Sequence, residues 1–203
     1  MFEIMDKKKV EPKKFPGNRE EAKKGVEAIL KYIGENIERE GLRETSERVV
    51  KSWDRMFGGY LQDPKEIFTT FEEDNVIPHD QIILLKDIEF YSTCEHHLLP
   101  FVGKAHVAYI PSNKVVGISK LARVVEIYAR RLQIQERVGN QVTSSLMENL
   151  NAKAAGCIIE SKHFCMTCRG VEKQNSVMVT SSMRGLFNTN IQIRTELLNL
   201  IKI

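Results

Sequence analysis

With 203 residues, the chain is long enough to bury a hydrophobic core without disulfides or a structural metal. Hydrophobic residues make up 42% of it and charged residues 28%, and the net charge of +3 at pH 7 is too small to indicate a nucleic-acid or anionic-membrane partner. The composition therefore predicts one globular domain with an appendage, and any acidic ligand must be held by local clusters of basic residues.

The cysteines are too few for a disulfide scaffold at this length: Cys94, Cys157, Cys165 and Cys168. The start of the chain is rich in lysine and lacks the apolar core of a signal peptide, and no apolar run reaches the length of a membrane span. We therefore expect a cytoplasmic protein without a membrane partner, whose cysteines are free or bound to metal.

The composition changes twice along the chain and divides it into three segments. Residues 1–17 combine lysines with two prolines and are typical of a flexible basic arm. Residues 18–75 show helical periodicity followed by a connection, and residues 76–203 carry the strands and the chemically interesting motifs. We expect an arm, an N-terminal helical region and a catalytic domain, in that order.

Two helices are predicted in the N-terminal region. The first begins at Asn18, with Glu21 completing a capping box, and its apolar spacing continues until Gly41. The second begins at Thr45 and ends at Gly58.

The remaining elements follow a simple order of two strands, two helices, two strands and a last helix. They are expected at residues 82–91 (with a bulge at Lys86 and Asp87), 101–110, 119–132, 136–150, 157–162, 177–183 and 191–201. Because consecutive strands can pair as hairpins around the helical insertion, the pattern predicts an α+β fold with a small antiparallel sheet.

Two short cysteine motifs have the spacing of metal ligands. Cys94 and His97 stand three residues apart, as do Cys165 and Cys168. All four together would make a closed, structural Cys₃His zinc site, whereas three of them would leave an open position for water. Spacing alone favours the structural site.

Three polar neighbours favour the open site instead. Glu95, His96 and His163 flank the cysteine motifs, and imidazoles beside a metal are typical of acid–base chemistry. Each of these residues alone is equally typical of an ordinary loop, so both kinds of site stay open at this point.

A second cluster has the features of an anion site. Ser119 is a candidate N-cap directly after a strand, Lys120 and Arg123 follow in the first turn of the helix, and Arg169 stands shortly after Cys165. These cations predict a phosphorylated substrate, although any one of them could simply face water. No glycine-rich phosphate loop accompanies them.

An adjacent amide and carboxylate, Gln135 and Glu136, occupy the junction between the two central helices. Such a pair can read the amide and amino edge of a guanine. Junctions between helices are also commonly polar without any ligand.

Four ordered motifs together closely resemble the GTP cyclohydrolase I family, from about residue 20 to the C-terminus. They are residues 94–101 (CEHHLLPF), 117–123 (GISKLAR), 133–137 (QIQER) and 163–170 (HFCMTCRG). The resemblance implies the tunnelling fold (T-fold), an antiparallel sheet of ββααββ order with an N-terminal helical region.

The resemblance also implies roles for individual residues. The zinc ligands would be Cys94, His97 and Cys165, while Cys168 falls where the family has no ligand, which reverses the preference from spacing. The catalytic residues would be His96, His163 and Ser119. The substrate contacts would be Gln135, Glu136, Lys120, Arg123 and Arg169, with Arg48 and Lys51 reaching in from a neighbouring subunit. This chain departs from the family at Ser46, where the family has a proline.

The implied reaction is zinc-dependent hydrolysis and rearrangement of GTP to 7,8-dihydroneopterin triphosphate with release of formate, the first step of tetrahydrofolate and pterin biosynthesis. His163 would protonate N7 of the purine. The resemblance further implies a toroidal homodecamer with sites at subunit junctions. The rival interpretation is a structural zinc module that binds nucleotide or RNA without turnover, with Cys168 as a fourth ligand.

Overall fold

The computed structural model describes most of the chain, namely residues 13–68, 70–72, 81–112 and 114–202. The chain divides into two compact units, residues 1–52 and residues 53–203. The predicted basic arm lies outside the described residues for its first twelve positions, as does part of the predicted connection before residue 81. No helix in the described part of the chain is long and apolar enough to cross a membrane.

The first unit holds helix α1 (Arg19–Tyr32) and the start of helix α2 (Thr45–Met56). Asn18 caps α1 as predicted, because its side chain accepts hydrogen bonds from the N–H groups of Glu20 and Glu21. The predicted start of α2 is confirmed as well.

The predicted end of α1 at Gly41 is wrong, because the helix stops at a glycine that comes earlier in the chain. Gly34 has a φ of 85°, a conformation that glycine adopts without strain. The N–H groups of Gly34 and Glu35 donate to the carbonyls of Lys31 and Leu30, which is the hydrogen-bond pattern of a Schellman motif. The residues after it form turns rather than a continued helix.

The second unit is built on a five-stranded sheet with the order β5-β2-β3-β6-β7. Its strands are β2 (Ile83–Cys94), β3 (Pro100–Ile110), β5 (Leu132–Gln133), β6 (Ala154–His163) and β7 (Met178–Gly185). All neighbours are antiparallel except β2 and β5. The predicted α+β class is confirmed, and so is the bulge, since the β2–β3 register shifts between Leu85 and Ile88.

The other elements of this unit surround the sheet. They are α3 (Ile118–Ala129), α4 (Gln135–Leu150), α5 (Phe164–Thr167), α6 (Leu186–Thr189), α7 (Ile191–Lys202) and the 3₁₀ turns η1 (Gly58–Leu61) and η2 (Pro64–Ile67). A separate pair of short strands, β1 (Thr70–Glu72) and β4 (Lys114–Val116), was not predicted as a pair.

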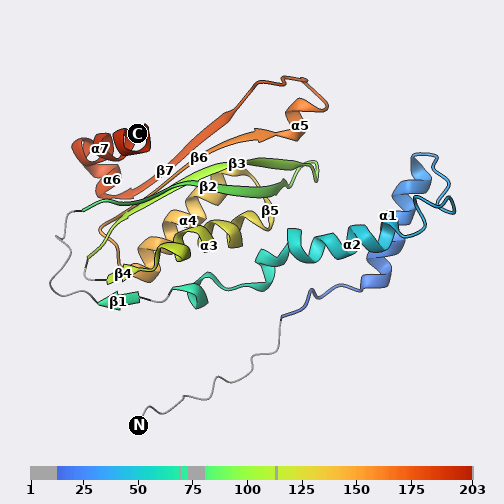
Figure 1. Ribbon diagram of the computed structural model, residues 1–203, viewed down its shortest axis with the longest axis horizontal. Helices are drawn as coiled ribbons and strands as arrows, with labels where there is room; N and C mark the ends of the chain where they lie inside the picture. Colours follow the sequence, from blue (N-terminus) through green and yellow to red (C-terminus); the bar gives the residue numbers. More distant parts are fainter. Residues whose placement is uncertain (1–12, 69, 73–80, 113, 203) are drawn as a thin grey trace, which may run out of the picture. The chain divides into compact units, whose positions relative to one another are not determined.

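Helices α3 and α4 lie on one face of the sheet (Figure 1). Their apolar stripes and the sheet residues that face them form the main core, in which Val124, Val138 and Leu146 are fully buried. A smaller cluster around Phe187 and Leu197 belongs to α6 and α7.

Helix α3 lies along the sheet and points towards the end that carries Cys94. Just before its start, the N–H of Val116 donates to the hydroxyl of Tyr109, which pairs with Ile83 at the beginning of β2. Just after its end, Gln133 pairs with Cys94, the last residue of β2. The 12 residues of α3 rise about 18 Å along the helix axis, so its first turn lies roughly that far from the end that leads to Cys94.

Candidate metal centre and active site

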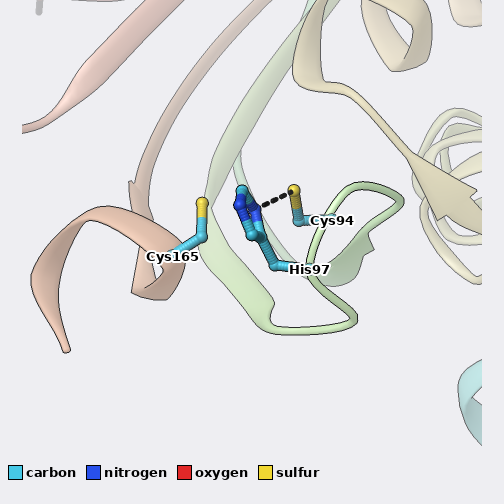
Figure 2. Close-up of side chains that lie close together, drawn as sticks. All are labelled: Cys94, His97 and Cys165. Atoms are coloured by element: carbon cyan, nitrogen blue, oxygen red, sulfur yellow. Dashed lines mark hydrogen bonds between the residues drawn. The ribbon is translucent and has the colours of Figure 1, made fainter. Parts of the chain in front are cut away.

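Three side chains from two distant segments meet at one end of the sheet. Cys94 is the last residue of β2 and is buried, His97 lies in the turn that follows, and Cys165 lies on α5 (Figure 2). Their ligand atoms all lie within 4.8 Å of one another. The pairing of Phe101 with His163 brings the end of β6, and with it α5, beside the turn.

The cluster fits a zinc ion. The Cys94 Sγ lies 3.8 Å from the His97 Nδ1, close to the roughly 3.6 Å expected for sulfur and nitrogen on adjacent corners of a zinc tetrahedron. Burial, and after it the neighbouring Cys94 thiol, raises the pKa of the Cys165 thiol. A bound divalent cation would favour the thiolate form of both sulfurs, and thiolate with imidazole is a donor set that suits zinc.

Cys168 stands apart from the cluster. Its side chain is exposed, and its thiol donates a hydrogen bond to the carbonyl of Phe164 at 2.8 Å. Among the described residues, the group with metal-binding geometry contains only one member of the Cys165–Cys168 pair. The geometry thus offers three protein ligands and not the four of a closed Cys₃His site.

His163 is held in one orientation beside the cluster. Its ring stacks on Phe101, with 4.7 Å between centroids and an interplanar angle of 3°. Its Nε2 lies 2.9 Å from the Oε1 of Gln135. Desolvation lowers the pKa of His163, partly opposed by the carboxylate of Glu136, so the neutral imidazole is favoured near neutral pH.

His96 lies at the exposed rim of the cluster, with its Nδ1 3.9 Å from the Cys94 Sγ. The adjacent Glu95 is bound by both terminal nitrogens of Arg137, one of them at 3.0 Å. The hydrogen bonds from Arg137 lower the pKa of Glu95, which keeps that carboxylate charged 3.9 Å from the His96 Nε2. Arg137 was not among the predicted site residues, because nothing in its spacing links it to Glu95.

The two predicted guanine contacts differ sharply in exposure. The side chain of Gln135 is completely buried and its amide is engaged in internal hydrogen bonds, whereas Glu136 is exposed. Only Glu136 can reach a ligand without a rearrangement.

One of the predicted phosphate contacts reaches the cluster. A terminal nitrogen of Arg169 lies 3.4 Å from the Nε2 of His97. Ser119, Lys120 and Arg123 lie in the first two turns of α3, whereas it is the other end of this helix that leads to the partner of Cys94. The structure therefore does not bring those three residues to the cluster within one chain.

The predicted N-cap at Ser119 is wrong. Helix α3 begins earlier, at Ile118, and the N-cap is Gly117, whose carbonyl accepts the N–H of Lys120 at 2.8 Å. Ser119 therefore lies inside the first turn with its side chain exposed. Arg48 and Lys51 lie on α2 in the first unit, where Arg48 pairs with Glu44 at 3.1 Å.

The sequence comparisons with known proteins agree with one another. The family model for GTP cyclohydrolase I matches residues 22–202. GTP cyclohydrolase 1 of Wolinella succinogenes is 54% identical over 177 residues, covering 87% of this chain and 94% of that protein. GTP cyclohydrolase 1 of Campylobacter jejuni subsp. doylei is 52% identical over 178 residues, covering 87% of this chain and 92% of that protein. Among solved structures, the apo archaeosine synthase QueF-like matches 54% of this chain and 97% of that chain, with a TM-score of 0.44 and 16% identity.

Proposed function

The chain belongs to the GTP cyclohydrolase I family, and from this premise we propose that the cluster of Cys94, His97 and Cys165 holds a zinc ion at the centre of its active site. The enzyme is a hydrolase of pterin and folate metabolism that converts GTP to 7,8-dihydroneopterin triphosphate with release of formate. The observation that carries the proposed site is the convergence of three soft ligand atoms within 4.8 Å beside an oriented, half-buried His163.

The open coordination position is what distinguishes this site from a structural one. When bound, zinc would supply a Lewis acid that activates water near neutral pH. Three protein ligands leave a place for that water, and Cys168, which points elsewhere, does not close it.

The histidines carry the proton transfers. His163 passes a proton to N7 of the purine: the free nitrogen of its neutral ring first takes up the proton that the attacking water releases and then donates it. It is the imidazole that the fold holds in a fixed orientation. His96 is exposed at the rim, where it can serve the later opening and rearrangement of the ribose together with Ser119.

The substrate contacts divide between guanine and triphosphate. Glu136 is exposed next to His163 and can accept hydrogen bonds from the N1–H and amino groups of guanine. Gln135 would have to exchange its internal partners to make the same contact. Arg169 supplies a cation at the cluster for the triphosphate.

The remaining contacts come from other copies of the chain, in a homodecamer with sites at subunit junctions. Two observations support this assembly. Ser119, Lys120 and Arg123 lie far from the cluster of their own chain, and β7 is an edge strand with exposed Val179, which another sheet could cover. Arg48 and Lys51 would also reach a neighbouring site. We further propose that the enzyme is cytoplasmic.

We propose the T-fold for residues 76–203, with ββααββ order, and a separate N-terminal helical region over residues 18–75. The element order of the second unit supports this assignment, since two antiparallel strands, two helices and two further strands follow one another around short additional strands.

Formate release from GTP, measured together with zinc content, tests the site. We expect wild type and Cys168→Ser to hold about one zinc per chain and to release formate, and Cys165→Ser to lose both properties. Cys168→Ser is the matched control, because it makes the same chemical change only three positions away. Loss of metal from Cys168→Ser would show that the ligand set is wrong. A wild-type protein that holds zinc but releases no formate would favour the rival structural module.

A further inference from the structure

We propose that Gln135 is a positioning residue that fixes both the ring orientation and the tautomer of His163, so that Nδ1 of His163 is the nitrogen presented to the substrate. This inference rests on the proposed role of His163 in proton transfer. It gives the Gln135 side chain a function other than direct contact with guanine.

The buried amide of Gln135 can be oriented in only one way. Its nitrogen, Nε2, lies 3.0 Å from the carbonyl oxygen of Ile159 and 3.1 Å from that of Met178. Carbonyl oxygens only accept hydrogen bonds, so the opposite orientation would place the amide oxygen against two acceptors in a fully buried position. Thr180 adds a third partner for the same nitrogen at 3.1 Å.

The amide oxygen of Gln135 is consequently aimed at His163. Oε1 accepts the hydroxyl proton of Ser161 at 2.6 Å and lies 2.9 Å from the Nε2 of His163. Because an amide oxygen cannot donate, the His163 Nε2 must carry a proton. In the neutral ring the lone pair is then on Nδ1, which is the position that can exchange a proton with the substrate.

The other constraints act on the same ring. The parallel stack with Phe101 fixes the ring plane, and the hydrogen bond to Gln135 fixes rotation within that plane. Gln135 is the first residue of α4 and bonds to both β6 and β7. The helix and two strands thus hold the amide rigidly, and the amide in turn holds His163.

The first test reads the tautomer directly, in the zinc-loaded protein without GTP. Solid-state ¹⁵N NMR of histidine-labelled wild type should show His163 protonated at Nε2 and not at Nδ1, the His163 signals being identified by their absence from a His163→Asn variant. A neutral His163 protonated at Nδ1 would overturn the proposal. This measurement does not depend on activity, so an inactive protein with the expected tautomer would contradict the proposed function and leave the positioning role intact.

The second test separates positioning from substrate binding. Gln135→Leu removes the acceptor, and we expect kcat to fall roughly ten- to a hundred-fold, with little change in KM and with a mixture of His163 tautomers. Thr180→Val is the matched control, since it removes one partner of the amide nitrogen without touching Oε1, and it should keep the Nε2–H tautomer and most of the kcat. A rise in KM with unchanged kcat in Gln135→Leu would show that the side chain binds guanine instead. If Gln135→Leu fails to fold, the NMR measurement of the His163 tautomer in the wild-type protein still tests the proposal.

Discussion

At the scale of single residues, the four cysteines illustrate how environment decides chemistry. Cys94 and Cys165 lie with His97 in one cluster whose ligand atoms are within 4.8 Å of one another, which is the basis of the proposed zinc site. Cys168 is exposed and bonds to a backbone carbonyl. Cys157 is buried in the main core, and desolvation raises the pKa of its thiol from 9.0 to about 12. Residue type and spacing alone could not separate these cases.

The raised pKa of Cys157 predicts a loss of stability in alkaline solution. The unfolded chain releases the thiol proton above pH 9, while the folded protein keeps it until about pH 12, so the contribution is complete below pH 9 and is lost as the pH rises through this window. In urea unfolding at about pH 8 and about pH 10.5, Cys157→Ala should therefore lose less stability with rising pH than wild type does. Equal losses in the two proteins would show that this thiol does not contribute. The other cysteines are common to both proteins and cancel in the comparison.

At the scale of elements, the sequence pattern predicted the strands and the bulge, which depend on neighbouring residues, but not the end of α1. Runs rich in β-forming residues predicted the strands. The bulge was visible as a break in the first of these runs, where Asp87 has a φ of 54° and its N–H donates to the Nδ1 of His106. The end of α1 was misplaced because Ile37 continues the apolar spacing of Ile29, Leu30 and Ile33 beyond Gly34. A single glycine in the left-handed conformation overrides that spacing.

The candidate site likewise has a part that the sequence predicted and a part that it did not. Its cysteine and histidine members stand in short motifs, so their residue types and spacing could be recognised. The hydrogen bonds of Arg137 to Glu95 and of Gln135 to His163 could not be recognised from the sequence, because they join residues 42 and 28 positions apart. Such partners depend on how α4 sits against the end of the sheet, which no local pattern specifies.

Two glycines in and after α1 allow a matched prediction for the helix end. Gly34→Ala should destabilise the protein by about 1–2 kcal/mol, because alanine is strained at a φ of 85°. Gly25→Ala should stabilise it by about 1 kcal/mol, because Gly25 lies exposed inside α1 and a Cβ there meets no atom within 4 Å. Urea unfolding followed by far-UV circular dichroism measures both effects. Changes of the same sign in the two variants would contradict the assigned end of the helix.

At the scale of the whole molecule, the long β2 strand separates the two halves of the predicted site. The metal ligands lie at its end, while α3 begins near its start and carries Lys120 and Arg123 there. The sequence motifs gave no measure of this separation, because it depends on the direction of α3, whose 12 residues place its first turn about 18 Å from the end that leads to Cys94. Whether one chain or two complete the site is therefore a question about assembly.

Mixing two defective proteins answers that question. His163→Asn is damaged at the cluster, and the double variant Lys120→Ala, Arg123→Ala is damaged at the start of α3, so each alone should release little formate. If one chain supplies the cluster and another supplies α3, random reassembly of equal amounts should restore about a quarter of the wild-type activity, the fraction of junctions that combine two intact halves. The same proteins mixed without prior dissociation serve as the control and should stay inactive. A reassembled mixture that remained inactive, although its chains had exchanged, would place the complete site within a single chain.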